Sequence, residues 1–234
     1  RYLAMGLMVL VGAAMQGVGG LGYAMFCAPL AAIFFPELVP GPLLAVGAPL
    51  ALLAYLRERD ALNGKVASAT LVGRVIGTFA ATGLLVYFSA NALSILFAVL
   101  ILVAVGLSMV GWRVQPTATN LSIAGVASGI MGTITAAGGP PFAIAMQHLA
   151  PPTMRSTLGV VFFAGTIVSI TALTWVNKMG AQEWLYFVVL LPWMLVGFFA
   201  SNQLARHVSK TAIRQWLLGT AAVSACVILL KVWL

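Results

Sequence analysis

Charge is scarce in this chain of 234 residues, and acidic side chains are the scarcest. Charged residues make up 7% of the sequence, with four Asp and Glu against twelve Lys and Arg, whereas about a quarter of the residues are charged in soluble proteins. The acidic residues Glu37, Glu58, Asp60 and Glu183 lie at the ends of apolar segments or between them. We therefore expect no carboxylate at mid-membrane depth, which disfavours a cation pore and a proton relay through Asp or Glu.

Catalytic and metal-binding patterns are lacking as well. Cys27 and Cys226 lie in apolar segments without CxxC or Cys/His spacing, so we expect buried, unpaired thiols. The sequence contains no nucleophile–base–acid set, HExxH motif, phosphate loop or pair of carboxylates in a plausible cleft. These observations predict neither an enzyme nor a cofactor or metal site.

Apolar residues are what the sequence has in abundance, with 62% hydrophobic residues and a mean hydropathy of +1.08. A bilayer core of ~30 Å needs about 20 apolar residues per helix, so the length allows about eight crossings and almost no soluble domain. The net charge of +8 would suggest nucleic acid in a soluble protein, but here the cations cluster in short polar connections, where they report orientation. The sequence predicts an all-α polytopic membrane protein with the lipid bilayer, and no nucleic acid, as its surroundings.

Two helix-breaking clusters interrupt the apolar segments, one at 17–22 and one at 136–141. At membrane depth no water can satisfy the backbone groups that a break exposes, so each break must face protein or a water-filled site. Glycine permits positive φ and a close approach of the backbone to a ligand, and proline at a helix start loses only an N–H that would have no partner. We therefore expect Pro140 or Pro141 to open a half-helix.

The two breaks together predict an anion-binding centre. The N-terminus of a half-helix carries free N–H groups and roughly half a positive charge, and broken helices near the bilayer midplane are common transporter sites. The alternative is that glycine and proline serve helix packing, since both are frequent in membrane helices. Because the two breaks occupy matching places in two halves of the chain, we favour the binding interpretation.

The chain is predicted to be duplicated, because an offset of 120 residues aligns Gly77-Thr78-Phe79-Ala80 with Gly197-Phe198-Phe199-Ala200. We expect a first transmembrane repeat over 1–112, a linker over 113–120 and a second repeat over 121–234. Each repeat would contain a broken half-helix pair, re-entrant or crossing once, plus three transmembrane helices.

Loop charges indicate how the repeats are oriented. If the broken segments are re-entrant, the repeats are inverted and eight cations lie on the cytoplasmic side against three outside. If each segment crosses once, the repeats are parallel and the division is seven against four. The positive-inside rule favours the inverted arrangement. Its cytoplasmic set is Arg57, Arg59, Lys65, Arg113, Arg155, Arg206, Lys210 and Arg214, and its outside set is Arg1, Lys178 and Lys231.

Two arginines are candidate anion ligands. Arg74 lies about two turns inside its span, where a central arginine costs on the order of 2.5–3.5 kcal/mol, so it should face protein or a water-filled cavity unless it snorkels to the interface. Arg155 follows Pro151-Pro152 and precedes two hydroxyl residues, and its planar guanidinium suits sulfonate, sulfate or carboxylate. The alternative role for Arg155 is that of a cytoplasmic anchor.

Gln147 and His148 end the second half-helix and could line a path or sit at the interface; for His148 a structural role is favoured. The predicted substrate-binding residues are Gly19, Gly20, Arg74, Gly138, Gly139, Pro140, Gln147, Arg155 and Thr157.

Several of these motifs resemble the TauE/SafE family, also called sulfite exporters or TSUP permeases. The resemblance rests on the first break with Pro29 behind it, the Gly138-Gly139-Pro140-Pro141 break, Arg155-Ser156-Thr157-Leu158 and the duplicated layout, and it covers nearly the whole chain. The chain departs from the usual pattern where Ala136-Ala137 precede Gly138 and where Leu21 follows Gly20.

The resemblance implies a multi-pass permease of the bacterial inner membrane for small sulfur-containing anions such as sulfite, sulfoacetate or other organosulfonates, with export as the expected direction. The residues alone indicate only a small anion. The resulting hypothesis is a secondary transporter with alternating access around a midplane anion site. The alternatives are a passive anion channel and a membrane scaffold subunit without transport, and the oligomeric state stays open, with a homodimer as one option.

Overall fold

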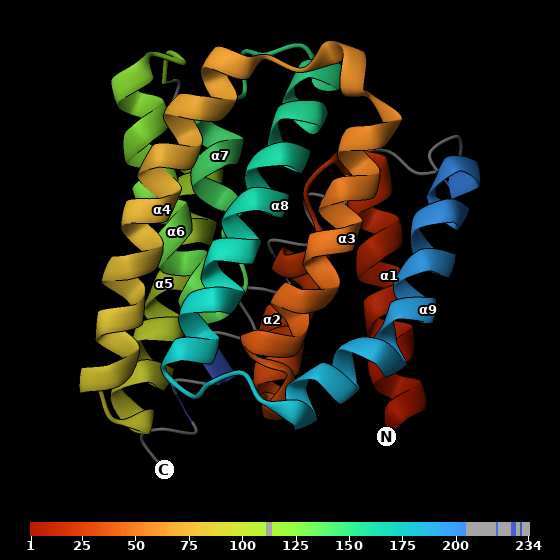
Figure 1. The fold of residues 1–234 in the computed structure, drawn as a ribbon, viewed down its shortest axis with the longest axis vertical. Helices are drawn as coiled ribbons and strands as arrows, with labels where there is room; N and C mark the ends of the chain where they lie inside the picture. Colours follow the sequence, from red (N-terminus) through yellow and green to blue (C-terminus); the bar gives the residue numbers. More distant parts are fainter. Residues whose placement is uncertain (111–113, 205–218, 220–225, 228–229, 231–234) are drawn as a thin grey trace.

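The computed structural model describes residues 1–110, 114–204, 219, 226–227 and 230, and its long helices stand side by side (Figure 1). The helices of this part are α1 (Tyr2–Gly19), α2 (Tyr23–Phe34), α3 (Gly41–Arg57), α4 (Gly64–Tyr87), α5 (Ala90–Val110), α6 (Ala118–Thr135), α7 (Pro140–Ala145), α8 (Pro151–Trp175) and α9 (Ala181–Leu204), with short 3₁₀ helices at Pro36–Leu38 and Arg59–Ala61. Four segments, namely α1, α4, α8 and Ala181–Ser201 of α9, are long and apolar enough to cross a membrane. The all-α polytopic prediction is confirmed, while the last 30 residues of the predicted second repeat, 205–234, lie largely outside the described residues.

The first broken segment turns back on itself. Figure 1 shows α1 leaving the N-terminus along the length of the molecule and α2 returning toward the same end. The guanidinium of Arg1, before α1, lies 2.6 Å from the carboxylate of Glu37, just after α2. The segment therefore begins and ends at one end of the molecule.

The second broken segment also turns back. After α6 the hydroxyl of Ser128 donates to the carbonyl of Gly138 at 2.6 Å, which places the break alongside the helix that precedes it. Phe142 of α7 then packs with Leu121, near the start of α6, and with Leu158, near the start of α8. The chain thus returns to the end of the molecule from which α6 came.

Left-handed residues end the first helix of both broken segments. Gly20 has φ 77° and its N–H donates to the carbonyl of Gln16 at 2.7 Å, and Ala136 caps α6 with φ 62°. Gly22 follows with φ 152°, a conformation that is essentially open only to glycine. In the second segment α7 begins at Pro140, so the predicted opening of a half-helix by proline is confirmed.

Glycines let α4 and α6 pack backbone to backbone. Gly73 and Gly77 of α4 face the backbones of Ser122 and Val126, and a Cβ at either glycine would overlap the facing carbonyl oxygen. Gly125 of α6, like Gly129 a turn later, faces the α4 backbone in return. Small residues spaced four apart are a common basis of close helix association in membranes, where dispersion replaces the hydrophobic effect as the driving force.

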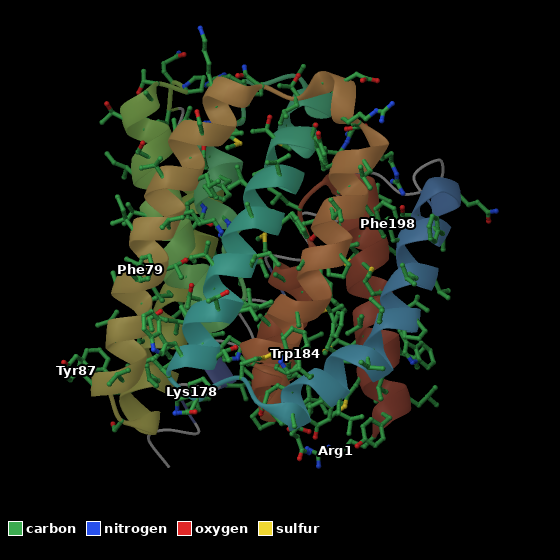
Figure 2. The ribbon with its side chains drawn as sticks, in the orientation of Figure 1. Arg1, Phe79, Tyr87, Lys178, Trp184 and Phe198 are labelled. Carbon is green, nitrogen blue, oxygen red and sulfur yellow. The ribbon has the colours of Figure 1, made fainter. Side chains whose placement is uncertain are left out.

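The basic side chains divide between the two ends of the described structure. Arg57, Arg59, Lys65 and Arg155 belong to one end, called here the Arg155 end. Arg1 and Lys178 belong to the other end, as Figure 2 shows. The remaining cations used in the charge count, Arg113, Arg206, Lys210, Arg214 and Lys231, lie outside the described residues.

The close packing of α4 on α6 predicts that Gly77→Ala destabilises the protein by about 1–3 kcal/mol, because the added methyl would force the two backbones apart. Thermal unfolding in detergent measures this change. Gly83→Ala is the matched control in the same helix, since nothing lies within 4 Å of a Cβ built there; it should be neutral or gain about 0.5–1 kcal/mol from helix propensity. Equal unfolding temperatures for the two variants would contradict the packing argument.

Candidate functional site

A cavity lies between the two breaks. Its volume of about 40 Å³ compares with the ~10–15 Å³ that one water needs, so it holds about three waters or one small anion. A Cβ built on Gly139 would lie 3.3 Å from the Leu21 side chain and 3.7 Å from the sulfur of Met25, which shows that the two breaks face each other. The lining residues are Gln16, Leu21, Gly22, Tyr23, Ala24, Met25, Leu43, Leu44, Gly47, Arg74, Ala136, Gly138, Gly139, Phe162 and Thr166.

Arg74 provides the positive charge of this cavity. Its side chain extends from α4 and the residue is 1% exposed, so it does not snorkel to the interface. Nη1 donates to the hydroxyl of Ser128 at 2.6 Å and lies 3.3 Å from the Ser128 carbonyl. The guanidinium lies 5.3 Å from the centre of the Phe162 ring, a cation–π distance. Nε has no hydrogen-bond partner among the described residues.

Small residues make the room that this arginine occupies. Gly165 of α8 lies against the Nε and Cδ atoms of Arg74, so that any side chain there would overlap them. A Cβ at Gly132 of α6 would lie 3.2 Å from Nη2 and 3.3 Å from Nη1, and a Cβ at Gly138 of the second break would overlap Nη1. The guanidinium is therefore held by three close backbone contacts and one serine.

No carboxylate among the described residues balances Arg74. Glu37, Glu58 and Asp60 pair with Arg1, Arg155 and Arg59, and the Glu183 carboxylate accepts the N–H of Gly180. A buried charge without a partner is strongly unfavourable because burial removes its hydration. A small anion in the cavity would supply the missing counter-charge.

The backbone donors at this cavity come from the first break. α2 begins there after Gly22 with no side-chain cap, and the N–H groups of Tyr23, Ala24 and Met25 make no hydrogen bond to a described residue. All three residues line the cavity. The first turn of a helix of 12 residues thus presents free N–H groups and the positive end of its dipole to the space beside Arg74.

The second break does not supply helix donors as expected. α7 has six residues, and its first two, Pro140 and Pro141, carry no N–H. The N–H groups of Phe142 and Ala143 both donate to the Gly139 carbonyl at 3.1 Å. The first four residues of this half-helix therefore offer no free N–H, because proline removes two donors and the Gly139 carbonyl accepts the next two. The anion site expected at this break stays a prediction.

The structure separates the predicted site residues into two groups. Arg74, Gly138 and Gly139 line the cavity, and Pro140 follows them directly and is buried. The other predicted residues, Gly19, Gly20, Gln147, Arg155 and Thr157, are not among the lining residues. Gln147 and His148 are exposed at the surface, and Thr157 is buried with its hydroxyl accepting the Asn63 N–H at 3.4 Å.

Arg155 is neutralised by Glu58. Its Nη2 lies 2.5 Å from Oε1 of Glu58 and its Nε lies 2.9 Å from Oε2, and both side chains are 21% exposed. The stem of Arg155 packs on Gly20, where a Cβ would overlap it. Arg155 therefore contacts the first break at the Arg155 end and not at the cavity.

Arg57, next to Glu58 in the chain, connects the Glu58–Arg155 pair to two more helices. Its Nη1 donates to the Gly17 carbonyl of α1 at 3.2 Å and its Nη2 to the Phe198 carbonyl of α9 at 3.4 Å. The guanidinium also stacks 3.9 Å from the centre of the Phe198 ring. Arg57, Glu58 and Arg155, called here the end cluster, thus join α1, α3, α8 and α9.

Sequence reasoning missed Ser128 and Gln16. Ser128 is a polar residue inside an apolar helix, and Gln16 is the last side chain before the glycine cluster of the first break. Gln16 lines the cavity, is 8% exposed, and its side chain has no hydrogen-bond partner among the described residues. A polar residue within apolar sequence near each break was the signal that would have identified both.

The ion pair between Glu58 and Arg155 predicts a coupling free energy of about 1 kcal/mol between Glu58→Gln and Arg155→Gln. This value is at the upper end of the range for surface ion pairs, because the pair is bidentate and only partly exposed. A double-mutant cycle of thermal stability measures it. Arg59 and Asp60 are the comparison pair: they are 3.8 Å apart with side chains 69% and 99% exposed, and should show no measurable coupling. Additive effects of the two substitutions at Glu58 and Arg155 would refute the ion pair.

Comparison with known families identifies one match. The family model of the sulfite exporter TauE/SafE matches residues 4–228, which includes Arg74 and both breaks. No curated protein and no solved structure is significantly similar to the chain.

Proposed function

The chain belongs to the TauE/SafE sulfite exporter family, and from this premise we propose that it exports sulfite or small organosulfonates across the bacterial inner membrane by binding them beside Arg74. Family membership makes it a membrane transporter of sulfur-containing anions and not an enzyme. The observation that carries the proposal is the guanidinium of Arg74, 1% exposed and without a carboxylate among the described residues, in a cavity between two backbone breaks.

The proposed ligands are the donors that remain free at this cavity. Among the described residues, Nε of Arg74 has no hydrogen-bond partner and the first-turn N–H groups of α2 are unbonded. An oxyanion offers several acceptor oxygens, which suits a planar guanidinium on one side and backbone N–H groups on another. Gly138 and Gly139 would let the backbone of the second break approach the anion closely.

The proposed architecture is a pair of inverted repeats, 1–112 and 121–234, joined by 113–120. This arrangement is supported by the two broken segments, which begin at opposite ends of the molecule and each return to the end where they began. Repeated contacts support it further. The 120-residue offset relates Gly77 to Gly197, and aligning the left-handed residues Gly20 and Ala136 relates Leu10 to Val126. Gly77 packs on the Val126 carbonyl, and Gly197 packs on the Leu10 carbonyl.

The same correspondence places the cavity between the repeats. Aligning Gly20 with Ala136 also relates Gly22 to Gly138, and both residues line the cavity, as do residues of α3 and α8. Rocking of the two repeats about such a site would expose it to each side of the membrane in turn. A small site beside a buried arginine suits a carrier of this kind better than an open pore.

We assign the remaining predicted residues to the route rather than to the bound anion. Arg155, held to Glu58 and packed on Gly20, would close the Arg155 end when the site faces away from it. Thr157, Gly19 and Gln147 would border the route at that end. If the positive-inside rule holds for the whole chain, this end is cytoplasmic.

The test is counterflow in proteoliposomes loaded with sulfite, sulfoacetate, sulfate, acetate or chloride. Wild type should exchange sulfur oxyanions saturably, and Arg74→Gln should reduce the exchange by at least about 100-fold, because it removes the only charge proposed to hold the anion. Arg74→Lys keeps the charge but not the planar fork and should be intermediate.

Arg59→Gln is the matched control, since Arg59 is an exposed arginine at the Arg155 end, and it should exchange like wild type. Unsaturable flux in the wild type would indicate a channel. Absence of exchange with every anion would favour a scaffold without transport and overturn the proposal.

A further inference from the structure

Within the proposed function, on which this inference rests, we infer that the transported species carries a single negative charge, so that sulfite crosses as hydrogensulfite and dianions such as sulfate are rejected. The observation is that, among the described residues that line the cavity between the two breaks, Arg74 carries the one charged side chain. The remaining lining residues are uncharged.

The groups that pack around Arg74 are neutral on every side. They are Ser128 and Gly132 of α6, Gly138 of the second break, and Phe162 and Gly165 of α8. Tyr23 is the titratable residue of the lining besides Arg74, and its hydroxyl donates to the Leu43 carbonyl at 3.3 Å. No acidic side chain of the described residues lies in this shell.

In the proposed duplication, the charge of Arg74 has no equivalent in the second repeat. Under the 120-residue offset the counterpart of Arg74 in α9 is Met194, which is fully buried and apolar. A site built from two equal halves would carry two cations and would match a dianion. The described lining of this cavity carries one cation, Arg74.

The single positive charge of Arg74 favours an anion with one negative charge over an anion with two. A monoanion beside Arg74 forms a neutral pair, which can stay buried while the repeats exchange access. A dianion leaves negative charge that the guanidinium of Arg74 does not neutralise, with only the partial charge of the α2 N-terminus to oppose it, and an unpaired buried charge is heavily penalised. The small volume of about 40 Å³ leaves little room for the waters that would otherwise solvate the second charge.

Sulfite itself provides the test, because its second ionisation falls close to neutral pH. The experiment measures sulfite exchange by wild-type proteoliposomes at fixed total sulfite, with equal pH on both sides, from mildly acidic to mildly alkaline conditions. We expect the rate to fall with rising pH, approaching about tenfold per pH unit above the ionisation, as the singly charged fraction does. Liposomes without protein correct for passive crossing of sulfur dioxide.

Methanesulfonate and sulfate separate titration of the substrate from titration of the protein. Methanesulfonate stays singly charged over this range, so its exchange should be independent of pH. Sulfate stays doubly charged and should compete with sulfite at least about tenfold more weakly than methanesulfonate does. Arg74→Lys keeps one charge and should keep the same order of competitors at lower affinity.

Exchange of sulfite that rises with pH, or sulfate competing as well as methanesulfonate, would overturn the inference and leave the proposed carrier intact. A methanesulfonate rate that falls with pH in parallel with sulfite would assign the titration to the protein and would also overturn it. Absence of exchange with all three anions would instead overturn the proposed function, and this inference with it.

Discussion

The structure depends on a constraint that the bilayer imposes on polar groups. Away from water, every N–H, carbonyl and charge must find a partner, because each orphan costs several kcal/mol. Helices satisfy most of the backbone, and glycine contacts bring α4 against α6 and α1 against α9 closely enough to exclude lipid. Among the described residues, the Arg74 guanidinium, whose Nε has no hydrogen-bond partner, and the first turn of α2, whose N–H groups are unbonded, border the same small cavity.

The two breaks contribute to this place in different ways. The first break turns at Gly20 and Gly22 and starts a helix whose N–H groups remain free. The second break turns at Ala136 and starts a helix with two prolines, so that its donors are absent or already bonded. It contributes instead a carbonyl to Ser128, which in turn holds Arg74. The first break therefore offers a helix N-terminus, and the second break holds the arginine in place.

Arg155 of the end cluster pairs with Glu58 and packs on Gly20, and it does not line the cavity. Arg155 and Glu58 satisfy each other, and Arg57 is occupied by two backbone carbonyls and an aromatic ring. These cations join four helices at the Arg155 end of the molecule. Arg74 instead lies at the cavity, where an anion would complete its coordination. Arg155 differs from Arg74 in having a carboxylate, that of Glu58, beside it.

The sequence by itself determined the class of the protein and the position of its breaks. Hydropathy over nearly the whole length requires helices, and the glycine and proline clusters interrupt them at 17–22 and 136–141 whatever the tertiary contacts are. Arg74, Gly138 and Gly139 could be named as site residues because a cation and backbone breaks within apolar sequence are costly unless they are used.

Tertiary structure alone decided which candidates meet. The distance along the chain does not reveal that Leu21 contacts Gly139, that Glu58 reaches Arg155, or that Ser128 and Gln16 belong to the site. Those relations follow from how the helices cross, and the crossings depend on which glycines face a neighbouring backbone. A one-dimensional pattern records the presence of these glycines, whereas only the packed structure shows which surfaces they bring together.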